Sequence, residues 1–241
     1  MILALDVGNS RIKWGLWQDP GFVAQGSIAT VDAPRLFDVL HVHARPQSII
    51  GSNVAGVPVA QRIEAALRPW RLNVRWIDSR QVQCGVTSDY LAPETLGTDR
   101  WAALIGAYRR VAGAAIVVDA GTAITIDALS AKGRFLGGLI LPGIELMERS
   151  LADGTAGLAL HSGSFEAFPR STMNAIRSGA LYAVCGAVER MMRALQMQEG
   201  TPPRVVLAGG AAPLIAPLLA VAPIIVPTLV LEGLVAIATA E

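Results

Sequence analysis

The sequence is poor in charged and aromatic residues. Among its 241 residues, charged side chains make up 16% and aromatic side chains 5%, whereas hydrophobic residues make up 52%. A chain of this composition can bury a substantial core, so a disordered protein is not expected. The 20 Lys and Arg residues nearly balance the 19 Asp and Glu residues, so no overall field favours nucleic acid or an anionic membrane as a partner. Any phosphate site must therefore be built locally.

Cysteine is scarce as well. The two cysteines, Cys84 and Cys185, fit no local zinc spacing and are too few for a disulfide framework. The N-terminus has no basic segment followed by an apolar helix, because Asp6 interrupts the first apolar run. These features predict a reduced, cytoplasmic protein that is not secreted.

One long stretch has no charged side chain, from Val205 to Leu231, and it is long enough to span a bilayer. Glycines and prolines divide it into pieces of strand and short-helix length: Gly209, Gly210, Pro213, Pro217, Pro223 and Pro227. The sequence therefore predicts a buried α/β segment here and no membrane span.

Two similar motifs organise the chain. The first, Asp6-Val7-Gly8-Asn9-Ser10, lies between an apolar run and an alternating run, which predicts a strand, a tight glycine turn and a returning strand. The pattern returns 113 residues later at Asp119-Ala120-Gly121-Thr122-Ala123. Two such hairpins, each near the start of one half, predict a duplicated α/β fold: two βββαβαβα-type halves, 1–113 and 114–241, with a ligand cleft between them.

The periodicity of the apolar residues gives the expected elements of each half. The first half is expected to hold strands at 2–5, 11–17, 22–28, 48–51 and 72–77, and helices at about 32–44, 58–67 and 99–111. The second is expected to hold strands near 115–119, 123–129, 134–141, 204–208 and 223–226. Its helices are expected after Pro142-Gly143, from 171–172 to about 196, after Gly209-Gly210, and from 228. Asp32 is the expected cap of the first helix, and Pro58 and Pro142 suit first turns. Residues 84–98 and 154–163 are expected to be loops.

The first hairpin has the chemistry of a phosphate site. A glycine turn lets backbone N–H groups around Gly8 point at an anion, while Lys13 supplies a positive charge and Asp6 can orient hydrated magnesium. Taken alone, the motif also fits an ordinary β-hairpin turn. The second copy favours phosphate binding, because a two-sided site needs a second hairpin. The sequence contains no P-loop motif and no full dinucleotide-binding motif.

A third motif, Gly97-Thr98-Asp99-Arg100, stands at the boundary between the expected loop and the expected helix. Asp99 suits a helix N-cap, and the same carboxylate can accept a proton from a substrate hydroxyl during phosphoryl transfer. The two roles do not exclude each other. Arg100 can bind a carboxylate through two parallel hydrogen bonds.

Together these motifs resemble those of type III pantothenate kinases, the family that includes the Bvg accessory factor proteins. That family belongs to the superfamily of actin-like ATPases and sugar kinases, which share a duplicated ribonuclease H-like fold. The resemblance covers essentially the whole chain. It depends on five motifs in order: Asp6 to Ser10, Gly97 to Arg100, Asp119 to Ala123, Gly137 to Gly143, and Ala208 to Ala211. Ser10 stands where many relatives have Thr, and it keeps the hydroxyl.

The resemblance implies a role for each motif residue. The expected ATP contacts are Asp6, Val7, Gly8, Asn9, Ser10, Arg11, Ile12, Lys13 and Thr122. The expected pantothenate contacts are Tyr90, Gly97, Thr98, Asp99, Arg100 and Thr172, with Asp99 as the general base. Asp119 matches the position at which the family binds a monovalent cation, potassium or ammonium, beside the magnesium-bound nucleotide.

The implied activity is ATP-dependent phosphorylation of pantothenate to 4′-phosphopantothenate, the first step of coenzyme A biosynthesis. The resemblance also implies a homodimer in which Thr172 reaches the neighbouring subunit's pantothenate site. Two alternatives remain open from the residues alone. One is a kinase for another small hydroxy compound, such as a sugar. The other is a non-catalytic regulator of the same fold that binds ATP or a protein partner.

Overall fold

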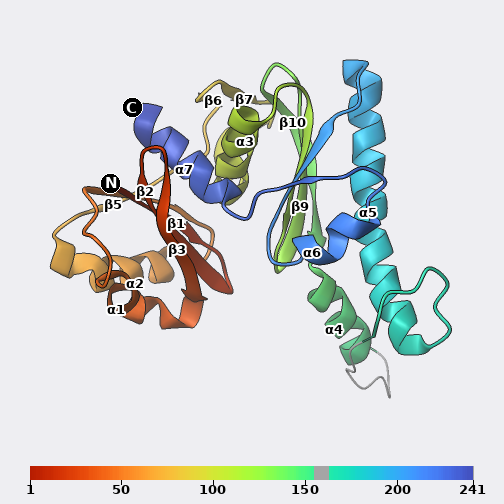
Figure 1. Ribbon diagram of the computed structural model, residues 1–241, viewed down its shortest axis with the longest axis horizontal. Helices are drawn as coiled ribbons and strands as arrows, with labels where there is room; N and C mark the ends of the chain where they lie inside the picture. Colours follow the sequence, from red (N-terminus) through yellow and green to blue (C-terminus); the bar gives the residue numbers. More distant parts are fainter. Residues whose placement is uncertain (155–162, 241) are drawn as a thin grey trace. The chain divides into compact units, whose positions relative to one another are not determined.

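The computed structural model describes residues 1–154 and 163–240, which form two compact units (Figure 1). Unit 1 consists of Met1–Arg110 and Thr228–Glu241, and unit 2 of Val111–Pro227. Each unit contains a set of five paired strands and helices of its own. The α/β class expected from the sequence is confirmed.

Unit 1 is built around a five-stranded sheet in the order β3-β2-β1-β4-β5. The central strand β1 pairs antiparallel with β2 and parallel with β4. This order places the end of β1 between a hairpin partner and a crossover partner. The strands are β1 (Ile2–Val7), β2 (Arg11–Gln18), β3 (Gly21–Ala29), β4 (Ser48–Asn53) and β5 (Val74–Trp76).

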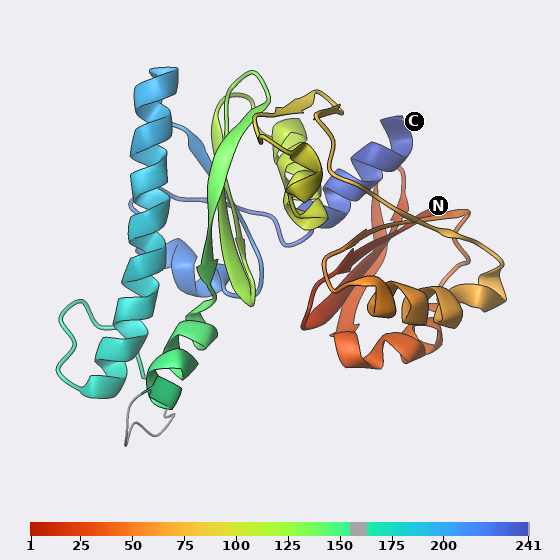
Figure 2. The same cartoon turned by 180° about the vertical axis from the view of Figure 1, so that it is seen from behind.

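The two faces of this sheet are covered by different helices. A 3-10 helix, η1 (Thr30–Arg35), with α1 (Leu36–Leu40) and α2 (Val57–Leu67), covers one face, where Leu3, Leu5 and Val7 of β1 enter the core (Figure 2). Side chains alternate along a strand, so Ala4 and Asp6 belong to the other face. That face contacts α3 (Thr98–Arg110) and α7 (Leu229–Ala240). Asp6 therefore lies on the side of the sheet where α3 begins.

Helices α3 and α7 pack closely because small residues line their contact. A Cβ atom added at Gly106 would lie 2.5 Å from the Leu229 carbonyl oxygen, and one added at Gly233 only 1.8 Å from that of Ala102. Glu232 of α7 also accepts two hydrogen bonds from the Arg110 guanidinium, at 2.6 and 2.8 Å. The last helix of the chain is thereby fixed to unit 1.

Unit 2 repeats the strand order of unit 1. The strands that belong to unit 2 pair in the order β12-β11-β8-β9-β10, with β8 antiparallel to β9 and parallel to β11. Counted along the chain, each of the five strands of unit 2 thus has the same place in the strand order as the corresponding strand of unit 1. The predicted duplication is confirmed. The strands are β8 (Ala115–Ala120), β9 (Ala123–Leu129), β10 (Arg134–Pro142), β11 (Arg204–Ala208) and β12 (Ile224–Ile225).

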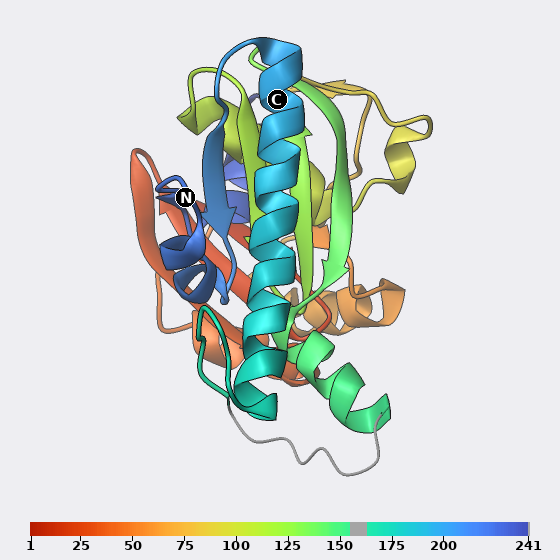
Figure 3. The same cartoon turned by 90° about the vertical axis from the view of Figure 1, so that its right-hand side faces the viewer.

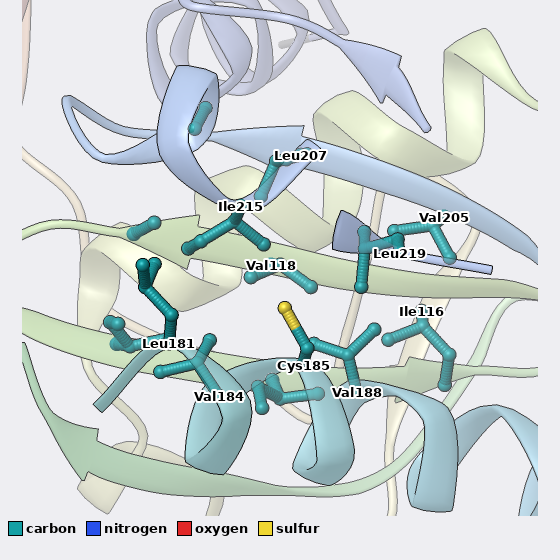
Figure 4. Close-up of a cluster of buried hydrophobic side chains, with 14 of the residues drawn as sticks. Ile116, Val118, Leu181, Val184, Cys185, Val188, Val205, Leu207, Ile215 and Leu219 are labelled. Carbon is teal, nitrogen blue, oxygen red and sulfur yellow. The ribbon is translucent and has the colours of Figure 1, made fainter. Parts of the chain in front are cut away.

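The long helix α5 (Thr172–Glu199) lies along one face of the unit 2 sheet (Figure 3). Its Leu181, Val184, Cys185 and Val188 point toward Ile116 and Val118 of β8 and toward Leu207 of β11 (Figure 4). Burial in this apolar cluster raises the pKa of the Cys185 thiol to about 11. The remaining helices of the unit are α4 (Ile144–Gly154), α6 (Ala212–Ile215) and the 3-10 helix η4 (Ala216–Leu218).

Two expectations about helices are wrong. The helix expected at 32–44 is the 3-10 helix η1 followed by one short α-helix that ends at Leu40, and Asp32 does not cap it. Pro34 lies inside this segment and lacks the N–H that a continuous α-helix needs. Pro142 is not in a helical first turn, because it is the last residue of β10 and α4 begins at Ile144.

The loop expected at 84–98 contains structure that the sequence analysis missed. Strands β6 (Val82–Gln83) and β7 (Val86–Ser88) form a small antiparallel hairpin. Cys84 and Gly85 make its two-residue turn, with φ of 50° and 85°. Two consecutive residues with positive φ are typical of hairpin turns. The 3-10 helix η3 (Pro93–Thr95) follows.

The last helix, α7, belongs to a different unit from the half in which the sequence division places it. The boundary at 113 assigns 228–241 to the second half, whereas α7 packs against α3 and β1 in unit 1. The loop expected at 154–163 lies almost entirely outside the described residues, which omit 155–162. In the part of the chain that is described, no helix has the length and apolar character needed to cross a membrane.

The α3–α7 contact makes a stability prediction. We expect Gly233→Ala to lower the free energy of unfolding by about 2–3 kcal/mol, because the new methyl group would overlap the backbone of Ala102. Gly186→Ala in α5 is the matched control, since nothing lies within 4 Å of a Cβ built there. It should raise stability by about 0.5–1 kcal/mol, the usual gain of Ala over Gly in a helix. Urea unfolding measures both, and equal stability of the two variants would contradict the close packing.

Candidate active site

The first hairpin joins β1 and β2 at the carboxyl end of β1. Asp6 lies opposite Lys13 across the two strands, and the Lys13 Nζ atom is 3.6 Å from the Asp6 Oδ2 atom. Asp6 is 7% exposed, so this carboxylate is largely removed from water. The hairpin thus holds one acidic and one basic side chain side by side at the strand end.

The turn of the hairpin is held by backbone and hydroxyl groups. The Gly8 N–H donates to the Arg11 carbonyl oxygen at 3.0 Å, and the Thr30 hydroxyl donates to the Gly8 carbonyl oxygen at 2.7 Å. The Thr30 N–H donates to the Ser10 carbonyl oxygen at 3.0 Å. Asn9, Ser10 and Arg11 are exposed. This leaves a fixed, accessible turn of the kind that can approach an anion.

The start of α3 brings the third motif together. The Arg100 N–H donates to the Asp99 Oδ1 atom at 2.7 Å, and a Cβ atom at Gly97 would lie 2.6 Å from the same oxygen. Glycine at 97 therefore makes room for the carboxylate. Because α3 begins at Thr98, Asp99 lies inside the first turn of the helix and not at the N-cap. In the first turn the positive end of the helix dipole favours a negative charge.

Arg100 and Tyr90 lie against each other. The Arg100 Nη1 atom donates to the Tyr90 hydroxyl at 3.1 Å, and the guanidinium carbon is 5.7 Å from the centre of the tyrosine ring. Arg100 is only 6% exposed. The structure therefore brings together two of the predicted substrate residues that are ten positions apart.

Several polar side chains that sequence reasoning missed hold the segment before α3. The buried Ser79 hydroxyl donates to the Leu96 carbonyl oxygen at 2.8 Å, directly before Gly97. The Trp101 indole N–H donates to the Gln83 side-chain oxygen at 2.9 Å, which ties the β6–β7 hairpin to α3. Single serines and glutamines carry no pattern that would have marked them in the sequence.

The second hairpin brings three predicted motifs together in unit 2. The Gly143 N–H donates to the Thr122 carbonyl oxygen at 2.8 Å, and the Ala211 N–H to the Ala120 carbonyl oxygen at 3.0 Å. Gly209, at φ +90°, approaches so closely that an added Cβ atom would lie 2.4 Å from the Ala120 oxygen. The turn after β11 and the end of β10 therefore both fix this hairpin.

Asp119 differs from Asp6 in its surroundings. Its Oδ1 atom is buried and accepts no hydrogen bond from the described residues. Along the sheet it pairs with Thr125 on β9 and Ala208 on β11, neither of which is charged. A buried carboxylate oxygen without a donor is costly, and a bound cation would remove that cost. The described residues contain no cluster of three or more His, Cys, Asp or Glu side chains that could hold a metal ion.

Thr172 is the first residue of α5 and is exposed. The side chain that caps this helix is Ser171, whose Oγ atom accepts the Asn174 N–H at 3.3 Å. Capping therefore accounts for Ser171 and leaves Thr172 without that structural role.

Comparison with known proteins identifies the family. The sequence pattern of the family described as type III pantothenate kinase matches residues 2–194. A type III pantothenate kinase from Azoarcus sp. (strain BH72) is 46% identical over 243 residues, which cover 100% of this chain and 92% of that protein. The chain belongs to the type III pantothenate kinase family. It is therefore a kinase, and the family expected from the motifs is confirmed.

Solved structures agree with the fold. A protein described as a Baf family transcriptional activator from Campylobacter jejuni is similar with a TM-score of 0.61 at 24% identity, over 99% of this chain and 98% of that one. A protein described as a 2-dehydro-3-deoxygalactonokinase from Sinorhizobium meliloti has a TM-score of 0.61 at 17% identity, over 100% of this chain and 99% of that one. At these identities the likeness is one of fold, and it confirms the expected fold class.

The two neighbouring glycines after β11 give a paired prediction. We expect Gly209→Ala to lower the free energy of unfolding by about 3 kcal/mol, because alanine is strained at positive φ and its methyl group would meet the backbone of Ala120. Gly210→Ala should change it by less than about 1 kcal/mol, since nothing lies within 4 Å of a Cβ atom there. Thermal and urea unfolding of both variants test this, and a larger loss in Gly210→Ala would contradict the described turn.

Proposed function

We propose that this kinase transfers the γ-phosphoryl group of ATP to the hydroxyl of pantothenate, giving 4′-phosphopantothenate in the first step of coenzyme A biosynthesis. The observation that carries the proposal is membership of the type III pantothenate kinase family over the length of the chain. The geometry of unit 1 supports it, because the phosphate hairpin and the start of α3 belong to the same compact unit. A sugar kinase or a regulator without activity has no comparable support.

ATP is proposed to bind at both hairpins. The exposed turn that follows Gly8 would offer backbone N–H groups to the phosphate oxygens, and Lys13 would balance their charge. The proposed contacts are those expected from the sequence: Asp6 to Lys13 in unit 1 and Thr122 in unit 2. Magnesium would neutralise charge on the phosphates, and the Asp6 carboxylate, next to Lys13, suits the hydrated ion.

Asp99 is proposed as the general base. Its Oδ1 atom is oriented by the Arg100 N–H, so the carboxylate has a defined direction at the start of α3. Phosphoryl transfer needs little covalent help from the protein, and its main requirements are positioning and stabilisation of charge. Gly97, Thr98, Asp99 and Arg100, together with Tyr90, would form the pantothenate site, in which Arg100 suits the carboxylate of the substrate.

Asp119 is proposed to bind a monovalent cation, potassium or ammonium. Asp6 has Lys13 as its cross-strand partner, whereas the equivalent partner of Asp119 is Thr125. The second hairpin therefore lacks the ammonium group that balances the first, and its Oδ1 atom has no donor among the described residues. A bound monovalent cation would supply the missing positive charge beside the nucleotide phosphates.

A homodimer is proposed as the working form, with Thr172 contacting pantothenate in the neighbouring subunit. Exposed apolar side chains on β10 and α4 support an interface on unit 2, since Leu139 is 40% exposed, Ile140 66% and Leu146 43%. No partner other than ATP, pantothenate and a second copy is proposed, and neither nucleic acid nor a membrane is included. The cytoplasm is the proposed location, because both substrates are small metabolites.

The general base is tested by Asp99→Asn. This variant keeps the shape of the side chain but cannot accept the proton, so we expect kcat to fall at least about 100-fold while ATP binding is retained. The assay is ADP release with pantothenate, magnesium and potassium, and isothermal titration measures ATP binding. A set of sugars tested in parallel separates a pantothenate kinase from a sugar kinase. Unchanged turnover in Asp99→Asn would rule out the assignment, and nucleotide binding without turnover in the unaltered protein would indicate a regulator.

The cation site is tested by Asp119→Asn. Removing the charge should reduce the rate ratio between potassium chloride and tetramethylammonium chloride about tenfold at equal ionic strength, as expected when a charged contact is lost. The thermal stabilisation that potassium gives the unaltered protein should disappear in the same variant, which provides a readout independent of turnover. If potassium activates and stabilises Asp119→Asn as it does the unaltered protein, the cation lies elsewhere.

A further inference from the structure

A row of polar side chains crosses the unit 1 sheet at the carboxyl end of β1. Asp6 pairs with Lys13 on β2 and, on the opposite side, with Ser52 on β4. Residues paired directly across strands lie on the same face of a sheet, so Lys13, Asp6 and Ser52 share the face that contacts α3 and α7. Ser52 is 0% exposed and belongs to none of the recognised motifs.

The Ser52 hydroxyl connects this row to the start of α3. Its Oγ atom shares a hydrogen bond of 2.8 Å with the Oγ1 atom of Thr98, the first residue of α3. The next residue is Asp99. A hydrogen bond between two hydroxyl groups is directional. Ser52 lies on a strand of the sheet, which is a rigid support for such a bond. One hydrogen bond therefore links the strand beside Asp6 to the turn that carries the proposed base.

We propose that Ser52 is a positioning residue for phosphoryl transfer. It holds Thr98, and with it the first turn of α3, in a fixed place relative to the phosphate hairpin, so that the Asp99 carboxylate meets the substrate hydroxyl. The inference rests on the proposed function, because it needs Asp99 as the base. The opposing view is that Ser52 only satisfies a buried hydrogen bond, in which case its loss would lower stability and leave the chemical step intact.

The size of the expected effect follows from the geometry. Ser79 holds the Leu96 carbonyl oxygen, so the chain before Gly97 stays fixed when Ser52 is altered. We therefore expect loss of the Ser52 hydrogen bond to displace the first turn of α3 by a fraction of an ångström and not to detach the whole segment. A displacement of 1 Å can cost about 100-fold in rate, so we expect about tenfold for a smaller shift.

The first experiment compares Ser52→Ala with Ser130→Ala. Ser130 is 4% exposed and its Oγ atom accepts the Arg134 N–H at 3.0 Å in the turn after β9, so the control also removes one buried hydroxyl outside any proposed site. We expect kcat to fall about tenfold in Ser52→Ala with the KM for ATP within about twofold, whereas Ser130→Ala keeps its kcat. Wild-type kcat in Ser52→Ala would overturn the inference, as would an equal loss in Ser130→Ala.

A double-mutant cycle with Thr98→Val tests whether Ser52 acts through Thr98. If it does, adding Ser52→Ala to Thr98→Val lowers kcat less than about twofold further, because the bond is already absent. A full tenfold further loss would overturn the inference. If Ser52→Ala does not fold, a kcat in Thr98→Val equal to that of the unaltered protein overturns the inference on its own.

Asp99→Asn, measured in the same assay, separates the two levels of the argument. Full activity in Asp99→Asn would show that Asp99 is not the general base, and the proposed function of that residue would be abandoned. An inactive Asp99→Asn together with a fully active Ser52→Ala leaves the proposed function standing and removes only the role of Ser52.

Discussion

The pairing of β1 with an antiparallel strand on one side and a parallel strand on the other is the constraint on which unit 1 depends. The antiparallel partner, β2, is joined to β1 by a tight turn directly after β1, and the two strands form the first hairpin. The parallel partner, β4, requires a crossover, which η1 and α1 supply. As a result the carboxyl ends of β1 and β4 lie side by side, and Asp6 and Ser52 meet there.

The second unit shows what a duplicated framework keeps and what it changes. The strand order and the hairpin are retained, but the row across the sheet differs: Lys13, Asp6 and Ser52 in unit 1 correspond in register to Thr125, Asp119 and Ala208 in unit 2. The carboxylate is kept while its charged neighbour and its hydroxyl neighbour are lost. The same strand geometry therefore places a lysine beside its acidic residue in one copy and only uncharged neighbours beside it in the other.

The sequence predicted the parts of the fold that depend on local pattern. Alternation and glycine turns located both hairpins, and the Ser171 cap and apolar spacing located α5. The helix expected at 32–44 is wrong because Pro34 lies within it. Whether a proline interrupts an α-helix depends on its position in the helix. The β6–β7 hairpin was missed because its strands are too short to show a period. The packing of α7 in unit 1 could not be predicted, because contacts between residues more than a hundred positions apart leave no local pattern.

The motif residues identify the family, but they do not explain their own geometry. Asp99 is oriented by the Arg100 N–H, given space by Gly97, and carried by a helix whose first residue is bonded to Ser52. Asp6 lies on β1, directly opposite Ser52 on the neighbouring strand β4. Because Asp6 and Asp99 both belong to unit 1, the sheet and helix of that unit set the spacing between the proposed phosphate site and the proposed base. Ser52 joins that strand to that helix, so its hydrogen bond to Thr98 contributes to this spacing without any contact between Ser52 and the substrate being required.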